Sequence, residues 1–134
     1  MRHLCAGLLF LLALGGCAEP PYTSVNNTEL KALLAQGVPI YDIRRPDEWR
    51  QTGVVQGSQK LTFVDEGSHV NPGFFTTFTQ RVRRDQPVII ICRSGSRSST
   101  LARELMERQG YTHVYNVKQG VTGWIAEANP VVHN

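Results

Sequence analysis

Short apolar runs alternate with amphipathic stretches along most of the chain. Residues 87–91 (PVIII) form the most apolar run, and their β-branched side chains are typical of a strand buried on both faces. Residues 39–43 and 113–117 predict two more strands, and 59–63 predict a short one. Because helical patterns lie between these runs, we expect an α/β fold with a mostly parallel sheet and helices on both faces.

Apolar residues at helical spacing predict the helices. The clearest helix covers 98–109, where an apolar face is opposed by outward pairs of opposite charge four residues apart. Gly110 follows it, at the place where a left-handed residue commonly ends a helix. The apolar face consists of Leu101, Ala102, Leu105 and Met106. Further helices are expected from a cap at Asn27 or Thr28 to about 36, over 74–83 and over 121–128.

The loop 92–98 (CRSGSRS) connects the most apolar strand to the clearest helix. Backbone N–H groups of a short loop and of a helix N-terminus attract anions. Gly95 permits backbone conformations that point such donors inward, and Arg93 and Arg97 add permanent cations. This environment favours the thiolate of Cys92 and predicts a nucleophile. An inert cysteine at the end of a core strand is the alternative, but the arginines, serines and glycine that follow argue against it.

The length of this loop limits the size of the anionic group that it can bind. Four residues separate Cys92 from Arg97, whereas cysteine phosphatases close their loop one residue later, at the position that Ser98 holds here. The longer loop of the phosphatases is wide enough for a phosphate group. The shorter loop favours a smaller anionic group, such as the outer sulfur of a persulfide.

Residues 92–98 resemble the active-site pattern Cys-Arg-x-Gly-x-Arg-Ser/Thr of the rhodanese family of sulfurtransferases. Residues 42–58 resemble a second signature of that family, with Val54 where histidine is usual and Ser58 where alanine is usual. Residues 119–124 resemble its closing Gly-Gly-x-x-x-Trp segment, with Gln119 in place of the first glycine. The resemblance covers about residues 24–128 and implies a rhodanese-like domain.

The resemblance also implies a double displacement with no cofactor and no metal. Cys92 would take a sulfur from thiosulfate or a similar small anionic donor and pass it to a thiol or to cyanide. Arg93 and Arg97 would orient the donor, and the loop amides would hold the persulfide. The substrate-binding residues implied in this way are Arg93, Ser94, Gly95, Ser96, Arg97 and Ser98.

Four residues outside the loop have simpler interpretations. Asp42 and Arg44 end the 39–43 strand at the edge where α/β folds place their sites. We interpret them as an ion pair that supports the Cys92 loop, with direct substrate contact as the alternative. His69 has no second histidine, cysteine or suitably spaced carboxylate nearby, so we expect a solvated loop residue and not a metal ligand. Trp49 is expected to anchor the core.

Two other functions stay open at this point. A catalytically idle rhodanese-like module could bind a partner, and an assay of turnover would separate it from an enzyme. A phosphatase or arsenate reductase could use the same cysteine, and an aryl-phosphate assay would reveal the phosphatase. The short loop argues against both of these enzymes. The absence of a resolving cysteine also argues against typical arsenate reductases.

The N-terminal residues predict export. Residues 1–16 have a short polar start and an apolar stretch too short for a mature membrane helix, as in a signal peptide. Residues 14–17 (LGGC) resemble a bacterial lipobox, which implies acylation of Cys17 and a lipid anchor on the periplasmic side of the cell envelope. Ala18 after that cysteine favours the outer membrane. Cleavage after Ala18, which would give a soluble periplasmic protein, is the alternative.

The remaining expectations concern domain limits and partners. The 134 residues predict one domain, with a tether at 17–23 and a C-terminal tail at 129–134. The formal net charge of +3 is modest, and no basic run with interleaved aromatic residues occurs, so nucleic-acid binding is not supported. Once Cys5 leaves with the signal peptide and Cys17 is acylated or removed, Cys92 is the only free thiol. The sequence does not predict the oligomeric state.

Overall fold

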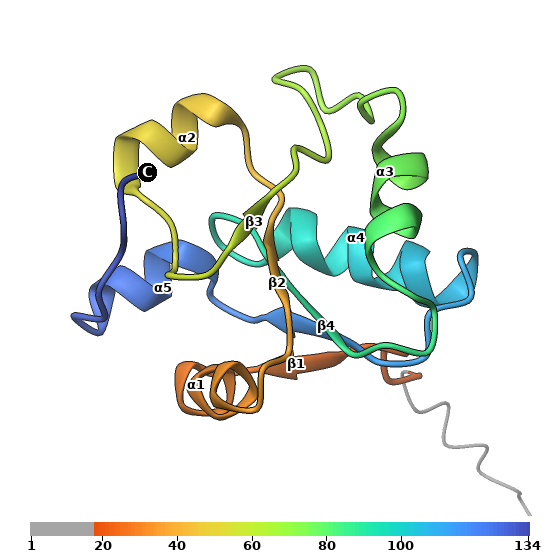
Figure 1. The fold of residues 1–134 in the computed structure, drawn as a ribbon, viewed down its shortest axis with the longest axis horizontal. Helices are drawn as coiled ribbons and strands as arrows, with labels where there is room; N and C mark the ends of the chain where they lie inside the picture. The colour runs from red at the N-terminus through yellow and green to blue at the C-terminus, as the bar shows by residue number, and fades with distance from the viewer. Residues whose placement is uncertain (1–17) are drawn as a thin grey trace, which may run out of the picture.

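The computed structural model describes residues 18–134, so the expected signal peptide and Cys17 lie outside the described residues. Five strands form one sheet in the order β1-β5-β4-β2-β3, and every neighbouring pair is parallel (Figure 1). The strands are β1 (Thr23–Val25), β2 (Ile40–Asp42), β3 (Gln59–Lys60), β4 (Val88–Ile91) and β5 (Val114–Val117). The helices are α1 (Asn27–Ala35), α2 (Pro46–Thr52), α3 (Phe74–Arg81), α4 (Ser96–Glu107) and α5 (Gly120–Ala126). The expected α/β architecture is confirmed.

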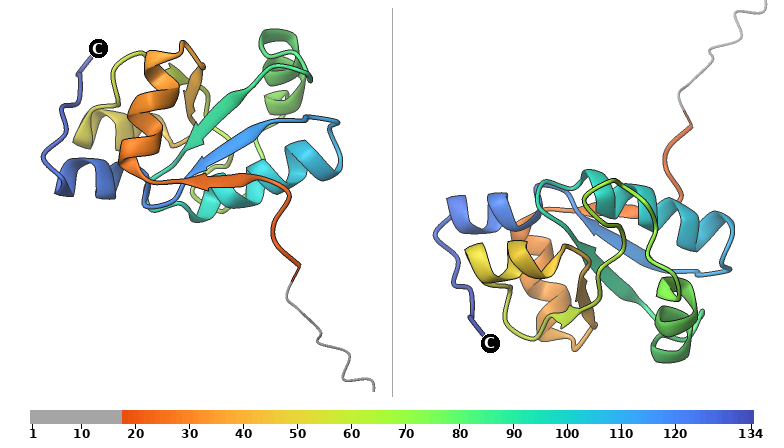
Figure 2. Two further views of the ribbon diagram at one scale, coloured as in Figure 1. Left: turned by 90° about the horizontal axis from the view of Figure 1, so that it is seen from below. Right: turned by 90° about the horizontal axis from the view of Figure 1, so that it is seen from above.

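The side chains of the central strand β4 divide between two cores, one on each face of the sheet. Ile89 and Ile91 pack with the residues of α1 and α5, whereas Ile90 packs on the opposite face with those of α3 and α4. Helices α1 and α5 lie on one side of the sheet, and α3 and α4 lie on the other (Figure 2). Because side chains alternate along a strand, Cys92 continues the α3–α4 series and belongs to that core. The alternation therefore decides on which face of the sheet the candidate nucleophile lies.

Several boundaries differ from the sequence-based expectations. Helix α4 begins at Ser96, two residues early, because Gly95 takes the cap position with a φ of 96°. Helix α1 is capped by Asn26, not by Asn27 or Thr28. The Asn26 side chain accepts a hydrogen bond from the Glu29 N–H, and the Glu29 carboxylate accepts one from the Asn26 N–H. Neither β1 nor α2 was predicted.

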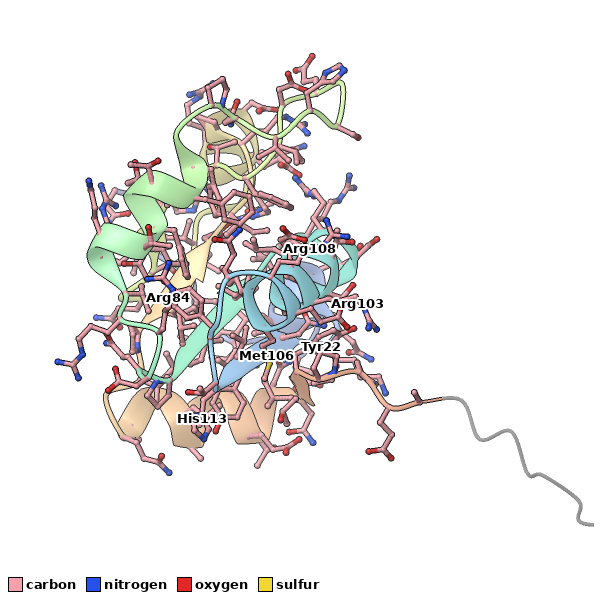
Figure 3. All side chains as sticks on the ribbon, turned by 90° about the vertical axis from the view of Figure 1, so that its right-hand side faces the viewer. Tyr22, Arg84, Arg103, Met106, Arg108 and His113 are labelled. Atoms are coloured by element: carbon pink, nitrogen blue, oxygen red, sulfur yellow. The ribbon has the colours of Figure 1, made fainter. Side chains whose placement is uncertain are left out.

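The two ends of the described chain lie against the domain. Tyr22 packs beside Met106 of α4, and the Arg103 guanidinium lies 5.9 Å from the centre of the Tyr22 ring (Figure 3). In the segment expected as a tail, Val132 exchanges two backbone hydrogen bonds with Val54, of 2.8 and 3.0 Å. Within residues 18–134, no helix is both long enough and apolar enough to cross a membrane.

Candidate active site

The sulfur of Cys92 accepts hydrogen bonds from the loop that follows it. The backbone N–H groups of Gly95 and Ser98 lie 3.2 and 3.4 Å from Sγ, and the Ser98 hydroxyl lies 3.2 Å away. Cys92 itself is 1% exposed. Donors that converge on a buried sulfur stabilise negative charge there, so this loop can hold a thiolate or a persulfide anion. The expected convergence of loop N–H groups on Cys92 is present, and anion binding by the loop stays a prediction.

Two glycines let the segment after β5 press against this loop. A Cβ on Gly95 would overlap the carbonyl oxygen of Lys118, and a Cβ on Gly120 would overlap those of Cys92 and Arg93. Both glycines have positive φ, of 96° and 58°. The close approach lets the first amides of α5 donate to the Cys92 and Arg93 carbonyls, at 2.9 and 3.0 Å. Gln119 takes the cap position of α5 at a φ of −107°, so no glycine is required there.

Ser98 is fixed by a residue that sequence reasoning missed. Its hydroxyl lies 2.5 Å from Oδ1 of Asn116, and both residues are buried. Asn116 lies in β5, beside the loop because β5 pairs with β4. The position of this polar residue in an otherwise apolar strand was the available signal. The structure therefore adds Asn116 to the candidate site.

Arg97 is held by a second residue that sequence reasoning missed. Its guanidinium binds the Glu48 carboxylate of α2 through two hydrogen bonds of 2.7 and 2.8 Å. Burial of Glu48 opposes ionisation, but the bonds from Arg97 and from the Arg45 N–H prevail and lower the pKa of Glu48 to about 2. The Glu48 carboxylate and, more weakly, negative charge on Cys92 raise the pKa of Arg97. Binding of a donor by Arg97 stays a prediction.

The expected ion pair between Asp42 and Arg44 is present and fully buried. Arg44 binds Asp42 through Nε and Nη2, and its remaining donors reach the Thr52 hydroxyl and the Gly53 carbonyl. The pair thus fixes the C-terminal end of α2 relative to β2, and α2 carries Glu48. Trp49 is only half-buried and donates to Asp42 at 3.0 Å, so it completes this polar network and does not anchor the apolar core.

The other loop residues face outward. Arg93, Ser94 and Ser96 are exposed, and within residues 18–134 neither serine forms a hydrogen bond with the Cys92 sulfur. Within residues 18–134 the Arg93 side chain has no hydrogen-bond or ion-pair partner. It lines a cavity of about 160 Å³ between the loop, α2 and α5. The other lining residues are Arg44, Glu48, Gln51, Thr52, Val121, Thr122 and Ile125. Since Arg44 and Glu48 are already paired, Arg93 is the uncompensated charge of this cavity.

His69 behaves as expected for a loop residue. Its side chain is 81% exposed and lies 3.3 Å from the Asp65 carboxylate. Residues 18–134 contain no group of three side chains arranged to hold a metal ion.

Comparison with known proteins agrees with this geometry. The family model of the Rhodanese-like domain matches residues 26–127. Thiosulfate sulfurtransferase GlpE from Pseudoalteromonas translucida is 36% identical over 97 residues, which cover 72% of this chain and 82% of that protein. A sulfurtransferase from Allochromatium vinosum is 32% identical over 110 residues, covering 81% and 92%.

A solved structure shows the same arrangement of the chain. The rhodanese-related protein from Thermoplasma volcanium superimposes with a TM-score of 0.65 at 26% identity. The superposition covers 84% of this chain and 100% of that one. The two chains therefore share this fold over most of the length of each.

Proposed function

The chain belongs to the rhodanese-like family, a family of sulfurtransferases, and we propose that it transfers a sulfane sulfur through a persulfide on Cys92. The main support for this proposal is the environment of the Cys92 sulfur. The Cys92 sulfur is buried and surrounded by the amides of Gly95 and Ser98 and by the Ser98 hydroxyl. Such an environment suits a sulfur atom that alternates between thiolate and persulfide.

The reaction takes two displacements. In the first, the Cys92 thiolate attacks the outer sulfur of thiosulfate or a similar donor. A new S–S bond forms, the S–S bond of the donor breaks, and its electron pair leaves with sulfite. In the second, a thiol acceptor in its thiolate form, or cyanide, attacks the outer sulfur of the persulfide, and the electron pair of the Cys92 S–S bond returns to the Cys92 sulfur. Loop donors that stay in place throughout lower the energy of each anionic state.

The two loop arginines have different roles in this proposal. Arg93 is exposed, unpaired within residues 18–134 and lines the cavity beside the loop, so it attracts and orients the anionic donor. Arg97 is bound by Glu48, so its charge reaches the sulfur from a fixed position. This division predicts that the two arginines affect different kinetic constants.

The experiment that tests the function is an intact-mass measurement on residues 18–134. The protein is reduced, incubated with thiosulfate, freed of excess reagent and compared with the variant Cys92→Ser. A gain of one sulfur atom on the wild type alone, reversed by cyanide, is the expected result. A reduced, alkylatable Cys92 that gains no sulfur from thiosulfate or from polysulfide would refute the persulfide mechanism and favour an idle binding module.

We also propose that the protein is attached to the periplasmic side of the cell envelope through a lipid on Cys17. The support is the LGGC sequence at residues 14–17 after a short apolar stretch. Metabolic labelling with palmitate followed by membrane fractionation tests it. We expect label and membrane association for the wild type and neither for Cys17→Ser. An unlabelled, soluble wild-type protein would instead indicate ordinary signal cleavage.

A further inference from the structure

The Ser98 hydroxyl occupies a position between two buried groups. It lies 3.2 Å from the Cys92 sulfur and 2.5 Å from Oδ1 of Asn116. Ser98 is 0% exposed and Asn116 is 4% exposed, so water does not compete freely for these bonds. A hydroxyl has a single proton to donate, and it therefore serves one of its two neighbours at a time.

The direction of that proton depends on the amide. With Oδ1 toward Ser98, the hydroxyl donates to Asn116, and its contact with the sulfur has to use the proton of a neutral thiol. With the amide turned by 180°, Nδ2 donates to the hydroxyl oxygen, and the hydroxyl proton is free to point at the sulfur. The first arrangement suits a thiol, and the second suits a thiolate or a persulfide anion.

We propose that Asn116 is a positioning residue that sets the direction of the Ser98 hydroxyl and so lets one site hold both the neutral and the anionic forms of Cys92. The inference rests on the proposed function only for the persulfide. Ser98 is the one partner that the structure gives to the Asn116 side chain within residues 18–134, so no other bond opposes rotation of the amide. An amide suits this role because it offers a donor and an acceptor and carries no charge.

Charged groups around Cys92 have to be held constant in a test of this kind. Arg97 of α4 is paired with Glu48 of α2, and Arg93 extends from the loop itself. The Asp42–Arg44 pair lies at the end of β2, next to β4, and Lys118 follows β5. Substitutions at positions 98 and 116 leave all of these groups in place. A change in the titration of Cys92 then reports on the serine and the amide.

The test measures the rate of Cys92 alkylation by iodoacetamide as a function of pH. Asn116→Asp keeps the shape of the side chain but, when ionised, can only accept a hydrogen bond, so it holds the Ser98 hydroxyl away from the sulfur. We expect the pH of half-maximal alkylation to rise by at least about one unit, as for loss of one hydrogen bond to a charged group. Ser98→Ala should produce a similar shift, and Asn116→Ala a smaller one.

The double variant Ser98→Ala/Asn116→Asp separates this role from simple repulsion by the new charge. If Asn116 acts through Ser98, the aspartate adds little once the hydroxyl is absent. An equal shift from Asn116→Asp with and without Ser98, or no shift in either background, would overturn the proposal. Asn27→Asp is the matched control, since Asn27 is also buried but bonds to the Gly123 carbonyl and not to Ser98, and it should leave the pH profile unchanged.

Two further measurements keep the outcome decisive. Thermal unfolding shows whether each variant is folded. If Asn116→Asp does not fold, the test uses the other variants. The pH of half-maximal alkylation should then be lowest for the wild type, higher for Asn116→Ala and highest for Ser98→Ala. An Asn116→Ala shift larger than that of Ser98→Ala would contradict the proposal. Sulfur gain from thiosulfate is recorded in parallel. A wild type that gains no sulfur while the alkylation shifts follow expectation refutes the proposed function and leaves the role of Asn116 standing.

Discussion

Replacing Glu48 by glutamine removes a charge from the contact between α2 and the Cys92 loop while preserving the shape of the side chain. In the native structure the Glu48 carboxylate receives two hydrogen bonds from Arg97 and one from the Arg45 N–H. The Glu48 residue is 7% exposed, so glutamine leaves the Arg97 guanidinium facing a neutral group where solvent is scarce. We expect Glu48→Gln to destabilise the fold and to loosen the loop.

The size of the effect follows from the acidity of Glu48. Its pKa falls from 4.5 to about 2 in the folded protein. At about 1.4 kcal/mol for each pKa unit, ionised Glu48 stabilises the fold by at most about 3.5 kcal/mol. Arg97 is 24% exposed, and solvent there screens part of the attraction. We therefore expect Glu48→Gln to lower the free energy of unfolding by about 2 kcal/mol at pH 7.

The stabilisation by Glu48 decreases in acid. A carboxylate whose pKa is depressed by folding contributes its full stabilisation above its unfolded pKa, and the contribution is lost as the pH falls toward the folded value. For Glu48 the loss begins below about pH 5 and continues to about pH 2. The difference between the wild type and Glu48→Gln should thus shrink from about 2 kcal/mol at pH 7 to less than about 1 kcal/mol at pH 3.

Urea unfolding of the wild type, Glu48→Gln and Asp47→Asn at pH 7 and pH 3 measures these differences. Asp47 is the matched control because it lies on the same helix and pairs with Arg45, but its side chain is 51% exposed. We expect Asp47→Asn to change the free energy of unfolding far less than Glu48→Gln does, because solvent screens an exposed pair. Equal losses for the two variants at pH 7, or a Glu48→Gln effect that does not shrink in acid, would refute the reasoning.

Three further predictions concern the loop itself. Gly95→Ala places a Cβ against a backbone carbonyl oxygen at positive φ and should lower the free energy of unfolding by about 3 kcal/mol or more. Gly37→Ala is the control, also at positive φ but with open space around it, and should lower that free energy by about 1 kcal/mol. Thermal unfolding measures both changes. Because Cys92 is 1% exposed, native protein should react much faster with a small alkylating agent than with a bulky aromatic disulfide. Unfolding in urea should abolish the difference between the two rates. Equal rates in the native protein would contradict this burial. In steady-state kinetics, Arg93→Ala should raise KM for thiosulfate about tenfold with little change in kcat. The control Arg103→Ala, at an exposed side chain, should leave both constants unchanged. An unchanged KM in Arg93→Ala would show that Arg93 does not bind the donor.

The parts of the fold that the sequence predicted well are those determined locally. Residues 88–91 are apolar throughout, and all four are buried in β4. The expected left-handed stop at Gly110 is confirmed at a φ of 79°. Leu101, Ala102 and Leu105 are buried as expected on the inner face of α4. In each case neighbouring residues alone determine the conformation, so periodicity and backbone preference are sufficient.

The parts that were missed depend on contacts between distant residues or on very short elements. Glu48 and Arg97 are separated by 49 positions, and no local pattern indicates that they meet. Strand β1 has three residues, two of them polar, and exists because it pairs with β5 at the edge of the sheet. Helix α2 had usable signals that were overlooked, since Pro46 at its first turn and two acidic residues after it are typical of a helix start.

The single direction of all five strands has a consequence for how the domain is presented to its surroundings. The chain enters the sheet at Thr23, at the amino edge, whereas Cys92 follows β4 at the carboxyl edge. Tyr22 fixes the entering segment against the far end of α4 (Figure 3). From Cys17 to Tyr22 an extended chain spans about 20 Å at most. A lipid at Cys17 would therefore hold the domain close to the bilayer by its rear edge, with the reactive sulfur directed toward partners in the aqueous space.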